Sequence, residues 1–297
     1  MSVQENKVKI LFVVNPVSGP NNTSWEEIIQ KYFSERNTAI EIFMLDEKPD
    51  EAALEKRIKI LEPEKVVAVG GDGTITMVAK IVAKTKCVLG ILPAGSANGM
   101  ARELNIPLDA EEALAVVESG EIKCCDAIKI NNKDVCLHLS DIGLNAQLIK
   151  YFDEGKVRGK LGYAKVILKT LWHKQKIQVI VQTQNTEVRR NAFMVVLANA
   201  SKYGTGAVIN PLGALDDGAF EVVIVRKLAL SELMKMLLKP MPFNPQKIET
   251  FSATSVAIET VRSAHFQIDG EYLGKISKLD AKILPDYINI VLPKSNS

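Results

Sequence analysis

Short apolar runs alternate with segments of helical period from residue 9 to about residue 123. The runs predict strands, because a strand that is buried on both faces of a parallel sheet is apolar at nearly every position. The segments between them repeat apolar residues every three or four positions and predict amphipathic helices. This order predicts a doubly wound α/β domain. The predicted strands are 9–14, 39–45, 66–69 and 87–92, and the predicted helices are 25–33, 50–61, 74–82 and 100–104.

After Asp126 the pattern changes to short apolar strands that are separated by turn residues. Such spacing predicts a mostly antiparallel β-sandwich with an inserted helix or two. We therefore expect an α/β domain over residues 1–127 and a β-sandwich domain over 128–297, with a last strand that could return to the first domain. The predicted strands are 136–140, 177–183, 192–198, 220–225, 255–259, 264–268 and 288–292.

One glycine-rich turn organises the first domain. The strand Val66–Val69 runs directly into Gly70-Gly71-Asp72-Gly73-Thr74, and a helical pattern begins at Thr74. Glycines leave room for a ligand to approach the backbone, and the amides at a helix start attract anions. The turn therefore predicts a phosphate site, and a tight βα turn with glycines for packing is the alternative. Its one carboxylate, Asp72, would repel bare phosphate, so Mg²⁺ or a reacting hydroxyl is its expected partner.

Two further predicted strands end in polar loops that contain glycine. These loops are Asn15-Pro16-Val17-Ser18-Gly19 and Pro93-Ala94-Gly95-Ser96-Ala97-Asn98-Gly99. Ligands bind at the carboxyl ends of strands in sheets of this kind, so both loops are candidates for the same site. Taken alone, Ser96 is typical of a helix N-cap and Asn98 of a turn.

The second domain contains two acidic turns. The turn at 215–218, with Asp216 and Asp217, is able to bind a hard cation or to serve simply as a β-turn. At 268–271, Asp269 and Glu271 flank a glycine at the end of an apolar strand. Glu271 is a candidate general base there, and an Asp-Gly hairpin turn is the structural alternative.

Charge is distributed unevenly along the chain. The net charge is +2, but residues 1–127 carry −6 and the remainder carries +8. Residues 156–176 hold seven basic residues and no acidic one, and from Leu161 they look like an amphipathic helix with Trp172 beside lysines. This pattern is typical of contact with an anionic membrane surface, and an ordinary surface helix with a solvated lysine face is the alternative.

Several classes of protein are excluded or disfavoured. No apolar run is long enough to cross a membrane, and the polar start does not resemble a signal peptide. The four cysteines form no C-x-x-C pair and are expected to be free thiols in a reducing cytosol. No G-x-G-x-x-G follows a strand, and G-K-[ST] is absent, so nicotinamide oxidoreductases and P-loop enzymes are not expected. The histidines lack zinc-ligand spacing, and few aromatics accompany the basic residues, which argues against nucleic acid.

Five motifs together resemble the diacylglycerol kinase catalytic-domain family, the bacterial lipid kinases related to sphingosine kinases. The motifs are NPVSG at 15–19, GGDGT at 70–74, PAGSAN at 93–98, LDDG at 215–218 and DGE at 269–271. The resemblance implies a nucleotide-binding α/β domain of NAD-kinase-like type, a β-sandwich domain and a site for a lipid alcohol. It implies a kinase that uses ATP and Mg²⁺ and transfers the γ-phosphate to a lipid hydroxyl such as that of diacylglycerol.

The resemblance also implies roles for individual residues. Glu271 would be the base, and Asp269, Asp72 and Asp126 would lie with it at the reacting centre. Asp217, with the carbonyls of Ala214 and Ala219, would hold a structural Mg²⁺. The residues that would bind the nucleotide are Asn15, Gly70, Gly71, Asp72, Gly73, Thr74, Gly95, Ser96 and Asn98.

Two other functions stay open at this point. GGDGT is shared with NAD kinases, so a soluble acceptor such as NAD is one alternative. Pro20 and Gly99 depart from the residues that are common in the family, which motivates a nucleotide- or lipid-binding module without turnover. For a kinase of lipids we expect a cytoplasmic protein, peripheral to the inner face of the membrane.

Overall fold

The computed structural model describes residues 9–18, 24–46, 49–154, 175–203, 206–238 and 242–294. The chain divides into two compact units. The first contains Met1–Cys125 together with Asp286–Ser297, and the second contains Asp126–Pro285. Two strands, β5 (Glu121–Ile130) and β14 (Glu271–Leu292), hold residues of both units.

A parallel sheet forms the centre of the first unit. Its strand order is β14-β4-β3-β1-β2, where the end of β14 pairs with β4 through Ile290 and Leu89. Every residue of β1 is buried, and so is every residue of β3 except Lys65, because helices cover both faces of the sheet. The strands are β1 (Ile10–Val14), β2 (Ile40–Met44), β3 (Lys65–Gly70) and β4 (Val88–Pro93).

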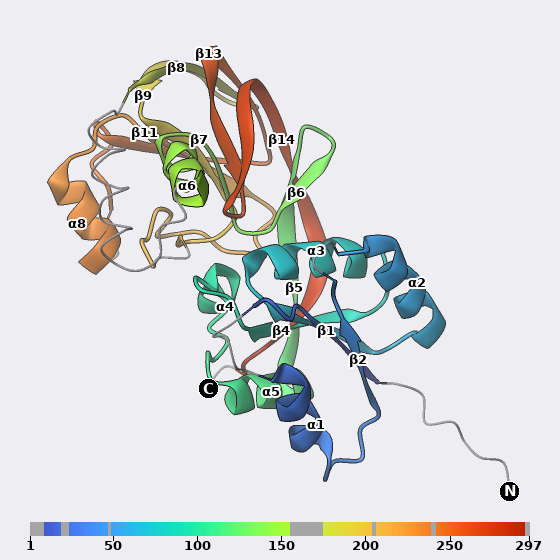
Figure 1. Cartoon of the computed structure of the whole chain (residues 1–297). Helices are drawn as coiled ribbons and strands as arrows, with labels where there is room; N and C mark the ends of the chain where they lie inside the picture. Colours follow the sequence, from blue (N-terminus) through green and yellow to red (C-terminus); the bar gives the residue numbers. More distant parts are fainter. Residues whose placement is uncertain are drawn as a thin grey trace, which may run out of the picture. The chain divides into compact units, whose positions relative to one another are not determined.

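The helices of this unit lie in two layers. Helices α2 and α3 cover one face of the sheet, and α1 and α5 cover the other (Figure 1). Local sequence accounts for α1, where Ser24 accepts a hydrogen bond from the Glu27 amide and Trp25, Ile29 and Phe33 are buried on one side. The helices are α1 (Trp25–Phe33), α2 (Glu51–Leu61), α3 (Asp72–Val82), α4 (Gly99–Glu103) and α5 (Ala110–Ser119).

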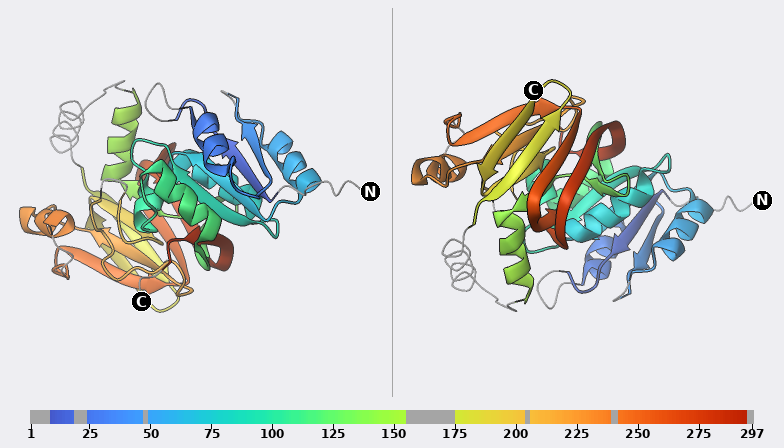
Figure 2. Two further views of the ribbon diagram at one scale, coloured as in Figure 1. Left: turned by 90° about the horizontal axis from the view of Figure 1, so that it is seen from below. Right: turned by 90° about the horizontal axis from the view of Figure 1, so that it is seen from above.

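The second unit is built from antiparallel strands. One set of neighbours runs β12-β11-β10-β7-β13-β14, while β8 pairs with β13 and β9 pairs with β8. The orange and red hairpin of β13 and β14 lies beside the yellow strands β8 and β9 (Figure 2). The remaining strands are β6 (Asp134–Cys136), β7 (Leu139–Gly143), β8 (Ile177–Thr183), β9 (Glu187–Ala192), β10 (Met194–Ala198), β11 (Phe220–Val225), β12 (Ile248–Ala253) and β13 (Ser255–Ile268).

Alternating residues of β10 and β11 enter two different cores. Val195 and Leu197 of β10 pack into a core that β8, β13 and β14 also line. Val196 and Ala198 of the same strand face a second core with Ile209 and Met236. Because successive side chains of a strand point to opposite faces, the central strands are buried on both sides. This arrangement is the β-sandwich that the sequence predicts.

Strand β13 takes part in both layers of the sandwich. Its first half, Val256–Thr260, pairs with β8, and its second half, Phe266–Ile268, pairs with β7. The register against β14 shifts between Glu259 and Ala264, where a bulge or irregularity interrupts the ladder. Such an interruption lets one strand pass from one sheet to another at a corner.

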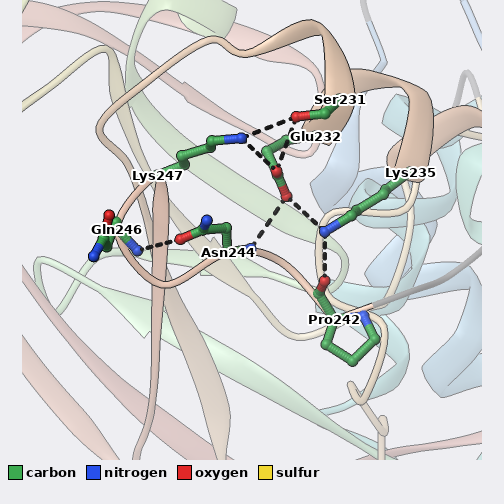
Figure 3. A network of polar contacts seen from close by, with 7 residues as sticks. All are labelled: Ser231, Glu232, Lys235, Pro242, Asn244, Gln246 and Lys247. Carbon is green, nitrogen blue, oxygen red and sulfur yellow. Dashed lines mark hydrogen bonds and ion pairs between the residues drawn. The ribbon is translucent and has the colours of Figure 1, made fainter.

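Within the described residues, the second unit also contains the helices α6 (Leu144–Glu154) and α8 (Leu230–Leu238). Glu232 near the start of α8 is buried and forms ion pairs with Lys235 and Lys247 (Figure 3). It also accepts a hydrogen bond from the Asn244 amide at 3.2 Å, so the network fixes the chain after α8 to the helix.

The structure differs from the sequence predictions in the bounds of some elements and in elements that were not predicted. Helix α3 begins at Asp72 and not at Thr74, because Gly73 adopts the helical conformation. The strand predicted at 136–140 is interrupted, since β6 ends at Cys136 and β7 begins at Leu139. The strands predicted at 255–259 and 264–268 are one strand, β13, and the strand predicted at 288–292 is the end of β14. Strands β5, β9 and β12 and helix α5 were not predicted.

Candidate functional site

The predicted glycine turn lies where β3 meets α3. Gly71 is the N-cap of α3 and provides no side-chain cap, so the first amides of the helix depend on other partners. A Cβ on Gly70 would lie 2.5 Å from the Cβ of Thr74, and a Cβ on Gly95 would lie 2.4 Å from the Cα of Gly71. The turn after β3 and the loop after β4 therefore touch through their backbones, which only glycine permits.

Asn15 joins the loop after β1 to the same turn. Its side-chain Nδ2 donates a hydrogen bond to Thr74 Oγ1 at 3.0 Å, and its amide donates to the Val69 carbonyl at 3.0 Å. Its Oδ1 accepts from the Val17 amide at 3.2 Å. The structure thus brings together the three predicted loops at the carboxyl ends of neighbouring parallel strands. Gly19 and Pro20 lie outside the described residues.

Asp72 ties two helix starts together. Its Oδ2 accepts a hydrogen bond from the Gly99 amide and its Oδ1 accepts one from the Met100 amide, both at 2.9 Å. Both oxygens are thus engaged by main-chain donors at the start of α4. The carboxylate therefore has a structural task in the loop after β4, in addition to the expected partner, Mg²⁺ or a hydroxyl, which stays a prediction.

Asn98 and Ser96 have different surroundings in that loop. Asn98 is buried, adopts a left-handed conformation with φ of 51°, and accepts the Gly95 amide on Oδ1 at 2.8 Å. It therefore acts as the turn residue that its type predicts. Ser96 is exposed on the same loop. The combined site offers backbone amides, a helix start and a hydroxyl, which suits a phosphate group.

In the second unit, Asp269 and Gly270 form the turn of the β13–β14 hairpin. Their φ angles are 49° and 90°, and Ile268 pairs with Glu271 across the turn. Two positive φ angles are typical of the two-residue hairpin turn that favours Asp-Gly. The hairpin alternative is therefore correct for these two residues. Glu271 is the first residue of β14, and its side chain is exposed.

The carboxylate of Asp269 is held by the main chain before β7. Its Oδ1 accepts the amides of His138 at 2.9 Å and Leu139 at 3.2 Å, and its Oδ2 accepts the Leu137 amide at 2.9 Å. The Cys136 thiol donates to Oδ1 at 3.1 Å, and burial together with the nearby Asp269 charge raises the pKa of that thiol. Asp269 therefore anchors the hairpin turn to the segment between β6 and β7.

Asp126 holds the loop that precedes β11. It is buried, and its Oδ2 accepts the Gly218 amide at 2.7 Å while its own amide donates to the Leu215 carbonyl at 2.6 Å. Asn199 Nδ2 donates to the Asp126 carbonyl at 3.0 Å. The structure thus brings Asp126 into contact with the 215–218 turn, which the sequence alone could not show.

Asp217 lies at the tip of that turn. It is exposed, and its Oδ1 accepts the Ala219 amide at 3.1 Å. Burial, with the Asp217 charge nearby, raises the pKa of Glu221. Across the described part of the chain, no three His, Cys, Asp or Glu side chains gather into a metal cluster. A carboxylate with the carbonyls of Ala214 and Ala219 is nevertheless the oxygen-donor chemistry that Mg²⁺ prefers, so the residue types fit the ion.

Sequence reasoning missed a buried carboxylate, Asp141 of β7. Only 1% of its surface is exposed, and burial raises its pKa to about 6 although Asn145, Gln267 and the Ala146 amide all donate to it. The available signal was an aspartate between the apolar residues Leu139 and Ile142. The predicted strand ended at residue 140, so this signal was not used.

Two expectations concern membranes. In the described ranges, no helix combines the length and the apolar character that crossing a bilayer requires. The basic stretch predicted to contact a membrane falls almost wholly outside the described residues, which resume at Gln175.

The chain matches two family models in tandem. Residues 9–130 match the diacylglycerol kinase catalytic domain, and residues 140–292 match the YegS C-terminal NAD kinase beta sandwich-like domain. These matches confirm the predicted fold class.

Curated relatives and solved structures show the same likeness. A "Probable lipid kinase YegS-like" of Chromohalobacter salexigens is 29% identical over 216 residues, which are 70% of this chain and 69% of the relative. A "Probable lipid kinase YegS" of Escherichia fergusonii is 26% identical over 95% of both chains. A crystal structure described as a diacylglycerol kinase from Bacillus anthracis str. Sterne superimposes with a TM-score of 0.76 at 18% identity, covering 96% of this chain and 97% of that chain.

Proposed function

The chain belongs to the diacylglycerol kinase catalytic-domain family with a YegS-type C-terminal domain, and we propose that it transfers the γ-phosphate of ATP to the hydroxyl of a lipid alcohol. One observation supports the nucleotide part of this proposal most directly. The loops after β1, β3 and β4 meet, and the turn before α3 carries no Cβ at Gly70 or at Gly71, where Gly71 contacts Gly95. Such a surface suits the phosphates of a nucleotide.

Phosphoryl transfer depends on positioning and on neutralising charge more than on covalent chemistry. We assign the phosphates to the turn Gly70–Thr74 and to Ser96 of the first unit, with Asn15 and Asn98 holding the loops in place. In the second unit, Glu271 would accept the proton of the acceptor hydroxyl. Asp72 and Asp269 support these elements through their contacts with main-chain amides.

We include Mg²⁺ in the proposal because the 214–219 loop offers oxygen ligands of the kind that this ion prefers. Asp217 and the carbonyls of Ala214 and Ala219 would hold it, and Asp126 fixes the loop through the Gly218 amide. When bound, Mg²⁺ supplies positive charge that offsets the negative charge of nearby phosphate and carboxylate oxygens.

The names of the curated relatives favour a lipid as the acceptor. Diacylglycerol and related alcohols fit equally well with the residues described, because each offers a hydroxyl on an apolar body. The description of the C-terminal family as NAD kinase-like favours NAD as a second candidate acceptor. Because a lipid acceptor resides in a membrane, we further propose that residues 156–176 contact anionic lipid from the cytoplasmic side.

Transfer of label from [γ-³²P]ATP tests the proposal. The full chain is incubated with Mg²⁺ and micelles that contain diacylglycerol, monoacylglycerol, phosphatidylglycerol or a sphingoid base, and in parallel with NAD. We expect a labelled lipid whose rate of formation Glu271→Gln lowers by roughly 100- to 10,000-fold, which leaves a measurable residual rate. Glu259→Gln is the matched control, because Glu259 is an exposed glutamate of the same hairpin that pairs only at the surface with Lys278. Labelled NADP would overturn the lipid assignment, and absence of every product would overturn the kinase assignment.

A further inference from the structure

A buried glutamine links the Asp-Gly turn to β7. Gln267 of β13 is 1% exposed. Its Oε1 accepts the Gly270 amide at 2.8 Å, and its Nε2 donates to Asp141 Oδ2 at 2.6 Å and to the Leu139 carbonyl at 3.4 Å. One side chain therefore contacts both the turn that precedes Glu271 and the buried carboxylate of the neighbouring strand.

The partners of Gln267 determine which way its amide faces. Only the carbonyl oxygen can accept the Gly270 N–H, and only the NH₂ group can donate to a carboxylate and a carbonyl. A flipped amide would place its NH₂ group against the Gly270 N–H and its carbonyl oxygen against the Asp141 carboxylate. Neither a glutamate nor an apolar side chain of the same length satisfies both ends, so the site is specific for glutamine.

Asp141 is itself held firmly at the far end of this link. Its Oδ1 accepts the Ala146 amide at 2.9 Å, and its Oδ2 also accepts Asn145 Nδ2 at 2.6 Å. Both donors lie in the first turn of α6, which begins at Leu144 directly after β7. A carboxylate at a helix start is favourable, and its partners fix its orientation. Gln267 is therefore attached to a rigid point.

The Asp-Gly turn is thus fastened on two sides. Asp269 binds the amides of residues 137–139, and Gln267 binds the amide of Gly270. The Ser140 hydroxyl adds a hydrogen bond of 2.7 Å to the Gln267 carbonyl. Glu271 follows this turn immediately and has an exposed side chain, so its position depends on how firmly the turn is held.

We propose that Gln267 is a positioning residue for Glu271, acting through the Gly270 amide and anchored by Asp141. This inference rests on the proposed function of Glu271 as the base. Displacing a catalytic group by about 1 Å lowers turnover by roughly 100-fold. Binding of ATP to the first unit does not depend on this turn, so we expect the effect to fall on turnover.

Steady-state kinetics of Gln267→Leu, Glu271→Gln and the double variant test the proposal, with dioctanoylglycerol micelles and ATP as substrates. We expect Gln267→Leu to lower kcat by roughly 10- to 100-fold while KM for ATP changes less than about twofold. We expect the double variant to be no slower than Glu271→Gln alone, because a positioning residue has no effect once its target is gone. The Gly270 amide should also exchange its hydrogen faster in Gln267→Leu.

Thr260→Val is the matched control. Thr260 lies on β13, is 8% exposed and donates across the same hairpin to the Ser277 carbonyl, so its loss tests general damage to β13 and β14. If Gln267→Leu does not fold, Gln267→Asn replaces it in the same comparison. Asparagine keeps the amide group, but its side chain is one methylene shorter. Equal kcat in the Gln267 and Thr260 variants, or additive effects with Glu271→Gln, would refute the positioning role while leaving the kinase assignment intact. Full activity of Glu271→Gln would instead refute the assigned base.

Discussion

Gly95 lies against Gly71 so closely that a Cβ on Gly95 would fall 2.4 Å from the Gly71 Cα. The loop after β4 is thereby pressed onto the turn after β3, and Asn98 holds it there through the Gly95 amide. The two loops can keep this contact only while both positions lack a side chain.

Gly95→Ala should separate the two loops. We expect the free energy of unfolding to fall by about 1–3 kcal/mol and the affinity for ATP to fall at least about tenfold, because the added methyl group overlaps backbone that cannot move away. Denaturant unfolding and titration with a fluorescent ATP analogue measure both effects. Ala97→Ser, at an exposed position of the same loop, is the control and should change neither quantity. Normal ATP affinity in Gly95→Ala would contradict the assignment of the phosphates to these loops.

Asp72→Asn should destabilise the chain even without nucleotide. The substitution replaces one acceptor oxygen by an NH₂ group, so either the Gly99 or the Met100 amide loses its partner. An unsatisfied amide costs about 1–3 kcal/mol. Denaturant unfolding in the absence of ATP checks this, with the exposed Asp46→Asn as the control. An unchanged free energy of unfolding would mean that Asp72 acts on the ligand alone.

Asp141 should make stability depend on pH in an unusual direction. Burial raises its pKa to about 6 in the folded chain, above the value of 3.8 expected when unfolded. Its contribution to stability is therefore complete below about pH 4 and is lost as the pH rises through 6. The difference in unfolding free energy between the wild type and Asp141→Asn should decline by up to about 3 kcal/mol from pH 4 to 7. A difference that grows with pH would contradict the burial of a carboxylate at this position.

Glu232 should show the opposite dependence. Burial alone would raise its pKa, but the Asn244 amide, Lys235 and Lys247 stabilise the carboxylate and lower the pKa to about 2 (Figure 3). Its contribution is present above about pH 4.5 and is lost as the pH falls towards 2. We expect Glu232→Gln to lower the free energy of unfolding by about 1–3 kcal/mol at pH 7 and by less at pH 3. Glu187→Gln, on an exposed surface pair, is the control.

The proposed membrane contact has its own test. Binding to vesicles should strengthen with their content of anionic lipid and weaken as salt is added, because lysine attraction to lipid headgroups is screened. Co-sedimentation with vesicles that contain phosphatidylglycerol measures this. Replacing both Lys165 and Lys169 by Glu should weaken binding, whereas replacing the exposed Lys56 and Lys59 of α2 by Glu should not. Binding that is indifferent to lipid charge would remove residues 156–176 from this role.

Local sequence was sufficient to predict an element wherever the residues that stabilise it lie close together in the chain. Helix α1 has the predicted bounds because its cap at Ser24 and its apolar stripe are separated by only a few residues. The glycine turn was recognisable because a strand, the glycines and a helix start occur within ten residues. Strand β9 was not predicted because only Ala192 is buried, whereas Val188 and Arg190 are partly buried and pair with residues of β8.

The tertiary structure decided what distant residues do to one another. The chain interrupts its strand between Cys136 and Leu139 because the amides there bind Asp269, about 130 residues later. It makes Asp72 a bridge between two loops, and it places Gln267 between the Asp-Gly turn and Asp141. Periodicity and motifs report on neighbours along the chain, whereas hydrogen bonds between strands depend on register. The sequence by itself therefore determined most of the elements and the family, and only the packed sheets decided which polar groups meet.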